Sequence, residues 1–125
     1  MATIKMCTDI PQSKKLVKIL SIKSADMYYY TVNGHSEWYK TPNVLESIDD
    51  LDMNGNSIAC WSLTALLNYL KSKNKFPDIK ELSDGRFKLT TFIWDGKNSH
   101  QVFIANNLVD ACYKLVLKLH ECEML

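Results

Sequence analysis

The chain has 125 residues, of which 46% are hydrophobic and 23% are charged, with 15 basic and 14 acidic side chains. This length fits one ordinary domain, and the composition excludes a chain that stays disordered over most of its length. The formal net charge of +1 lacks the basic excess that neutralises nucleic-acid phosphates. We therefore expect a single globular domain over residues 1–125, for which nucleic acid is not the favoured partner.

The sequence also indicates a cytoplasmic protein. Its apolar runs are far shorter than the roughly 20 residues that cross a bilayer, and the segment 1–9 lacks the apolar stretch of a secretory signal. The four cysteines are scattered and form no C-x-x-C pair, a pattern typical of reduced thiols rather than of a disulfide framework. We expect no membrane contact and no cofactor.

In chain order, the segment from Ile4 to Cys7 favours a short strand, and a helix over residues 10–20 follows it. Thr8 or Asp9 can cap this helix with a side-chain oxygen, and Pro11 fits its first turn. Next, the strand formers of residues 27–32, an Asn-Gly turn and the segment 37–39 predict a first hairpin. The segment 41–56 shows no regular pattern.

A second helix is expected to begin after Ser62, a good N-cap, and to end before Pro77. Residues 86–94 and 100–105 alternate apolar and polar side chains around a tight Asp-Gly connection, which predicts a second hairpin. A last helix, capped by Asn106 or Asn107, carries an apolar stripe at steps of three and four residues.

These elements predict an α+β fold. We expect an antiparallel, twisted sheet of about four strands, built from the two hairpins, with about three helices packed mainly on one face. The order of the strands in the sheet does not follow from the sequence.

Four segments carry a resemblance to known proteins: 7–16 (CTDIPQSKKL), 25–30 (ADMYYY), 60–67 (CWSLTALL) and 109–115 (VDACYKL). In this order they resemble a group of small hypothetical proteins encoded on prophages and mobile elements of gut anaerobic bacteria. The segment 35–56 matches nothing in that group. The resemblance implies an accessory protein of a mobile element, and it brings no catalytic residue with it.

The first candidate site is the aromatic cluster of the first hairpin, with Tyr28, Tyr30, Trp38 and Tyr39 as binding residues. Tyr and Trp often anchor protein interfaces, because they combine a large contact area with a polar tip. Tyr28 and Tyr30 should share one side of their strand, and Tyr29 should take the other. The alternative interpretation is ordinary cross-strand packing over the sheet.

A second pattern resembles the opening of a calcium-binding loop. Asp50, Asp52 and Asn54 supply oxygens at positions 1, 3 and 5, and Gly55 stands at position 6. Position 12, which needs a bidentate Glu, is Trp61. An acidic surface loop is therefore the preferred interpretation, and no metal site is assigned.

Cysteine and lysine residues give weaker candidates. Cys60 stands near a helix N-terminus, where thiolates are favoured, and could pair with His100 as a nucleophile. His120 and Cys122 are two residues apart on a helix and point away from each other, which disfavours a zinc site. The basic run Lys71, Lys73, Lys75 and Lys80 could contact nucleic acid, but the near-neutral net charge favours a solvated helix end.

No constellation in the sequence names a reaction, so no catalytic residue is assigned and an enzyme is the less favoured class. The leading hypothesis is a small accessory protein that binds another protein through the tyrosine-rich hairpin. The alternatives are a thiol-dependent enzyme centred on Cys60 and a nucleic-acid-associated protein. Self-association through an edge strand or through the hairpin also stays open.

Overall fold

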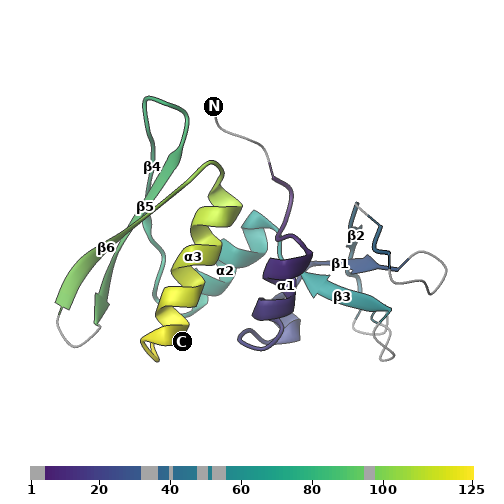
Figure 1. Ribbon diagram of the computed structural model, residues 1–125. Coiled ribbons are helices and arrows are strands. Elements are labelled where there is room, and N and C mark those ends of the chain that lie inside the picture. The colour runs from purple at the N-terminus through teal and green to yellow at the C-terminus, as the bar shows by residue number, and fades with distance from the viewer. Residues whose placement is uncertain (1–4, 32–36, 40, 48–50, 52–55, 95–97) are drawn as a thin grey trace. The chain divides into compact units, whose positions relative to one another are not determined.

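The computed structural model describes residues 5–31, 37–39, 41–47, 51, 56–94 and 98–125 (Figure 1). These residues form α-helices, one short 3-10 helix and two antiparallel sheets. In chain order the elements are α1 (Ile10–Leu16), η1 (Ile22–Ser24), β1 (Met27–Tyr30), β2 (Asn43–Val44), β3 (Ser57–Cys60), α2 (Leu63–Ser72), β4 (Asp78–Glu81), β5 (Phe87–Trp94), β6 (Asn98–Ala105) and α3 (Leu108–Glu121).

The chain forms two compact units, and each is described by itself. The N-terminal unit is Cys7–Ala65, and the C-terminal unit is Leu66–Leu125 together with the residues up to Met6. The boundary between them falls inside α2. The expectation of one domain over residues 1–125 stays a prediction.

The N-terminal unit contains a sheet with the order β2-β1-β3. Its central strand, β1, pairs Met27 with Val44 on one side and with Cys60 on the other. Helix α1 packs against β3. Asp9 caps α1 through a capping box, in which Gln12 N–H donates to the Asp9 carboxylate at 2.9 Å and the Gln12 side chain accepts from Asp9 N–H at 3.0 Å.

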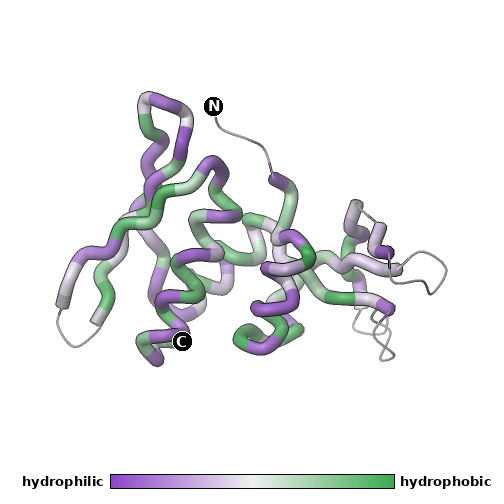
Figure 2. The backbone as a smooth tube through the Cα atoms, in the orientation of Figure 1, coloured by the Kyte–Doolittle hydropathy of each residue, from purple (hydrophilic) through white to green (hydrophobic). Residues whose placement is uncertain are grey.

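The C-terminal unit contains a sheet with the order β4-β5-β6 and the helix α3, which packs against β5 and β6. Leu89 and Ile93 alternate with the exposed Phe92 along β5 and are fully buried. Hydrophobic and hydrophilic residues alternate along α3 (Figure 2), and its apolar stripe completes this core with Val109, Ala111, Cys112, Leu115, Val116 and Leu119. A helix with such a stripe is stable mainly because it covers one face of a sheet.

The α+β class is confirmed, and the arrangement of the strands is corrected. The described strands form two sheets of three, whereas the sequence predicts one sheet of about four. The second hairpin is confirmed as β5 and β6. Strands β2, β3 and β4 were not predicted, because they are short and lack the run of strand-forming aromatic residues that marks β1, which is equally short.

The first hairpin is confirmed only in part. Thr31 and Trp38 form an isolated antiparallel bridge, and Tyr39 N–H donates to the Tyr30 carbonyl at 2.9 Å. The segment 37–39 is nevertheless not a strand of the sheet, since β1 pairs with β2 and β3 instead. Likewise Cys7 makes one bridge to Ser62, and Ile4 lies outside the described residues.

The helices agree with the sequence except at one end. Helix α1 stops at Leu16 rather than at residue 20, because Lys18 and Ile19 donate to carbonyls three residues back. Ser62 caps α2, with Ala65 N–H donating to its Oγ at 3.2 Å. Asn107 caps α3, with Asp110 N–H donating to its Oδ1 at 2.8 Å. Across the described ranges, every helix is too short or too polar to traverse a lipid bilayer.

Candidate functional site

The three consecutive tyrosines of β1 divide between the two faces of its sheet. Tyr29 is 7% exposed and packs in the core, whereas Tyr28 and Tyr30 are half-buried on the opposite face. The alternation follows from the pleat of a β-strand, which sends successive side chains to opposite faces. The sequence predicts this division, and the structure confirms it.

Tyr28, Tyr30 and Tyr39 form a continuous row of rings, which we call the tyrosine face. The ring centroids of Tyr28 and Tyr30 are 6.1 Å apart, and those of Tyr30 and Tyr39 are 4.4 Å apart. Both distances lie in the range of attractive aromatic pairs. Tyr39 is the most open of the three, with 38% of its surface exposed.

Trp38 does not belong to the tyrosine face. Its side chain packs against the buried cluster of Cys7, Tyr29 and Cys60. Tyr39, the next residue, instead stacks its ring on Tyr30, so the two neighbouring side chains lie on opposite sides of the sheet. The structure thus brings together three of the four residues that the sequence singles out and separates the fourth.

On the core side of β1, the Tyr29 hydroxyl connects several buried groups. It donates to the Thr8 carbonyl at 3.0 Å and lies 3.3 Å from Cys7 Sγ. Burial, followed by the hydrogen bond with Cys7, raises the pKa of the Tyr29 hydroxyl far above its ordinary value. Tyr29 is therefore a protonated structural residue, and its role differs from that of its two neighbours.

Cys60 lies in the same cluster and is fully buried. Its hydrogen bond with Cys7, followed by burial, raises the pKa of the Cys60 thiol far above its ordinary value. A nucleophilic cysteine needs the opposite, a lowered pKa and access to substrate. The proposed partner His100 belongs to the other unit. The position of Cys60 before a helix therefore does not make it an activated thiolate.

Asp26 fixes the start of β1, a role that the sequence does not reveal. The Asp26 carboxylate accepts from Ser62 N–H at 2.9 Å and from the Ser62 hydroxyl, while the Asp26 carbonyl accepts from Leu45 N–H at 2.9 Å. Nearby, Trp61 Nε1 donates to Ser24 Oγ at 2.9 Å. These bonds hold β1 in register, so that the tyrosine face has a rigid support. Because Asp26 and Ser62 are 36 residues apart, no local pattern could have revealed their contact.

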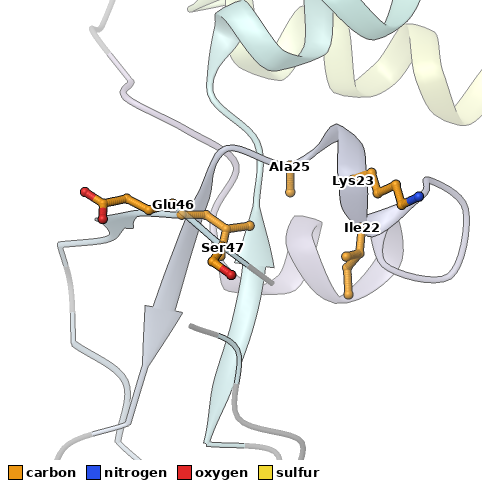
Figure 3. Close-up of a pocket in the computed structure, with 6 residues that line it drawn as sticks. Ile22, Lys23, Ala25, Glu46 and Ser47 are labelled. Carbon is orange, nitrogen blue, oxygen red and sulfur yellow. The ribbon is translucent and has the colours of Figure 1, made fainter. Parts of the chain in front are cut away.

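A shallow pocket of about 290 Å³ borders the beginning of β1. Its apolar part comes from Ile22, Ala25 and Leu45, and its polar part from Lys23, Glu46 and Ser47. Figure 3 shows the Lys23 ammonium and the Glu46 carboxylate pointing to opposite sides. The pocket is large enough for a single apolar side chain.

The remaining candidates gain no support from geometry. Asp50, Asp52 and Asn54 lie outside the described residues. Within the residues that the structure covers, no group of three or more His, Cys, Asp or Glu side chains could hold a metal ion. In the basic run, Lys71, Lys73 and Lys80 are exposed, and Lys73 Nζ lies 5.7 Å from the Tyr69 ring centroid, as expected for a solvated helix end.

No protein-family model, curated protein or solved structure matches this chain.

Proposed function

We propose that this protein binds another protein through the tyrosine face, formed by Tyr28, Tyr30 and Tyr39. The observation that carries the proposal is the row of touching rings on the sheet face opposite to the buried Tyr29. Core tyrosines are enclosed on all sides, whereas these three keep part of their surface in water. They are therefore available for contact.

Tyrosine suits this role for energetic reasons. Its ring contributes a large contact area, its hydroxyl can form hydrogen bonds at the rim, and only two torsions lose freedom on binding. Here the rings already rest against one another on a strand held by Asp26. Such preorganisation lowers the entropic cost of association.

The pocket beside the first turn of η1 and the start of β1 gives the partner a second point of attachment. We place an apolar side chain of the partner over Ile22, Ala25 and Leu45. This combination of an aromatic surface and a side-chain pocket fits a folded or extended protein segment better than a charged polymer. The formal net charge of +1 likewise supports a protein partner over a nucleic acid.

We further propose a cytoplasmic setting, in which the protein serves a mobile element by engaging a protein of the host. The four cysteines form no disulfide, which agrees with a reducing compartment. The role in a mobile element is proposed on the basis of the sequence resemblance described above.

The test is affinity capture from a bacterial lysate, followed by calorimetry with the purified partner. Replacing all three residues of the tyrosine face by serine should abolish capture. The single variant Tyr39→Lys should weaken binding by at least about tenfold, as expected for an aromatic residue that anchors an interface. Val44→Ser, which alters a side chain 65% exposed on the same sheet, is the matched control and should bind normally.

Near-ultraviolet circular dichroism checks that each variant keeps its fold. Unchanged affinity of a folded Tyr39→Lys protein would contradict the proposal. Equal loss in the Val44→Ser control would also contradict it, because the effect would then not be specific to the tyrosines.

A further inference from the structure

The two edges of the C-terminal sheet differ in their protection against pairing. The edge strand β4 is four residues long, directly follows Pro77, and carries Asp78, Lys80 and Glu81, which are all exposed. Short length, charge and a nearby proline are the usual devices by which proteins prevent an edge from pairing with another chain. Edge strand β4 is therefore protected against pairing with another chain.

The opposite edge strand, β6, has none of these devices in its own sequence, although near its C-terminal end the Lys114 ammonium of α3 donates to the Ile104 carbonyl at 2.9 Å. It is eight residues long, and its sequence NSHQVFIA contains no proline and no Lys, Arg, Asp or Glu. Along its whole length it pairs with β5, and in the described part of the chain no strand pairs with its other side. Every second N–H and C=O of a strand in this position points outward and can accept a further strand.

The outer side chains of β6 are also unusually apolar for an open sheet face. Val102 is 51% exposed near the middle of the strand, and Phe92 on β5 is 48% exposed beside it. The Phe92 ring packs edge-on against His100, with centroids 5.0 Å apart. An apolar strip therefore runs along the same edge that lacks protection.

We propose that β6 is a self-association edge, and that a second copy of this chain adds its own β6 in antiparallel orientation. In such a pair, opposite residues must lie on the same face of the sheet. Val102 then lies opposite Val102 of the partner subunit at the two-fold axis, and Ile104 lies opposite the partner's His100. Both contacts remove exposed apolar surface from water.

The absence of charged side chains from β6 favours a second copy of this chain as the strand that pairs with it. A strand that pairs with itself places each charged residue near its own copy, and like charges across a sheet are destabilising. Because β6 has no Lys, Arg, Asp or Glu, self-pairing meets no such penalty. The charged edge β4 then lies at both ends of the combined six-stranded sheet, so assembly stops at a closed dimer rather than a fibre.

Sedimentation over a wide range of concentrations provides the first test. The mass should rise from 14.4 kDa to twice that value as the concentration increases. Val102→Lys places two like charges at the two-fold axis and should weaken dimerisation by at least about tenfold. Because Val102 is half exposed, this variant should fold normally.

Two controls separate edge pairing from other modes of association. Phe92→Lys changes the same face but lies on β5, so it should leave edge pairing within about threefold of the original affinity, whereas stacking of two sheet faces would be lost. Ile79→Lys alters the opposite edge strand and should have no effect. Loss of the dimer in Phe92→Lys but not in Val102→Lys would overturn the proposal.

Amide hydrogen exchange gives the direct readout. Alternate amides of β6 should become protected as the concentration rises, while amides of β4 keep their exchange rates. A protein that stays at 14.4 kDa at millimolar concentration, or one whose β6 amides do not change, would refute self-association through β6. Neither result bears on the tyrosine face, which lies in the other unit.

Discussion

The two sheets of this protein are stabilised in different ways. The C-terminal sheet is covered by the aliphatic stripe of α3, and its core contains mainly Leu, Ile and Val. The N-terminal sheet has a core in which Cys7, Tyr29 and Cys60 meet, and it is joined to its surroundings by side-chain hydrogen bonds over long sequence separations. The first arrangement tolerates changes that conserve volume, whereas the second depends on particular atoms.

The largest effect is expected where aliphatic packing dominates. Leu115 is fully buried on α3, so Leu115→Ala should lower the free energy of unfolding by about 2–5 kcal/mol, through lost burial and the resulting cavity. Chemical denaturation measures this change. Leu117→Ala removes the same atoms from a half-buried position and should cost clearly less. Equal losses would mean that α3 does not cover the sheet with the stripe described.

A smaller effect is expected where charge-assisted hydrogen bonds dominate. Asp26→Ala leaves the Ser62 N–H and hydroxyl without their acceptor and should lower the free energy of unfolding by about 1.5–3 kcal/mol. Asp26→Asn keeps one acceptor oxygen and should lose less. If both variants match the original protein in thermal and chemical denaturation, the N-terminal unit does not depend on this contact.

Alkaline pH should lower the free energy of unfolding, because both units bury thiol or phenol groups that are protonated in the folded protein. Burial raises the pKa of the Cys112 thiol from 9.0 to about 12, because an apolar core disfavours the charged form. In the unfolded chain the thiol loses its proton first. The stabilisation is therefore fully present below about pH 9 and is lost as the pH rises from 9 towards 12.

Between these values the free energy of unfolding should fall by about 1.4 kcal/mol per pH unit for this thiol alone. Tyr29 and Cys60, whose pKa values are also raised, steepen the decline in the N-terminal unit. Urea denaturation at several pH values measures the slope. Cys112→Ala should reduce it, and an unchanged slope in that variant would show that the thiol is not protected.

The contrast between the two sheets also explains what the sequence could predict. Helix α3 and the hairpin of β5 and β6 were foreseen, because their apolar residues repeat with the period of their own secondary structure. The pattern along 108–121 already implies the face that covers the sheet. The packing of α3 on its sheet can therefore be predicted from residues that are close together in the sequence.

The N-terminal unit was foreseen less completely. The division of the tyrosines between two faces followed from the pleat of a strand, but the assignment of Trp38 to the core did not. Strand β3 is defined by its pairing with β1, in which Tyr30 lies opposite Ser57, and Asp26 gains its role only through Ser62. Information about such contacts is spread over distant residues, so a local pattern cannot contain it.

Thr8 shows what this distant pairing means while the chain is being made. Its N–H donates to the Trp61 carbonyl at 2.9 Å, and its hydroxyl accepts from Trp61 N–H at 3.1 Å. Trp61 follows 53 residues later, and ribosomes add roughly 5–20 residues per second. During translation Trp61 is therefore added several seconds after Thr8, and the contacts between Thr8 and Trp61 form only when the last residues of the N-terminal unit have been synthesised.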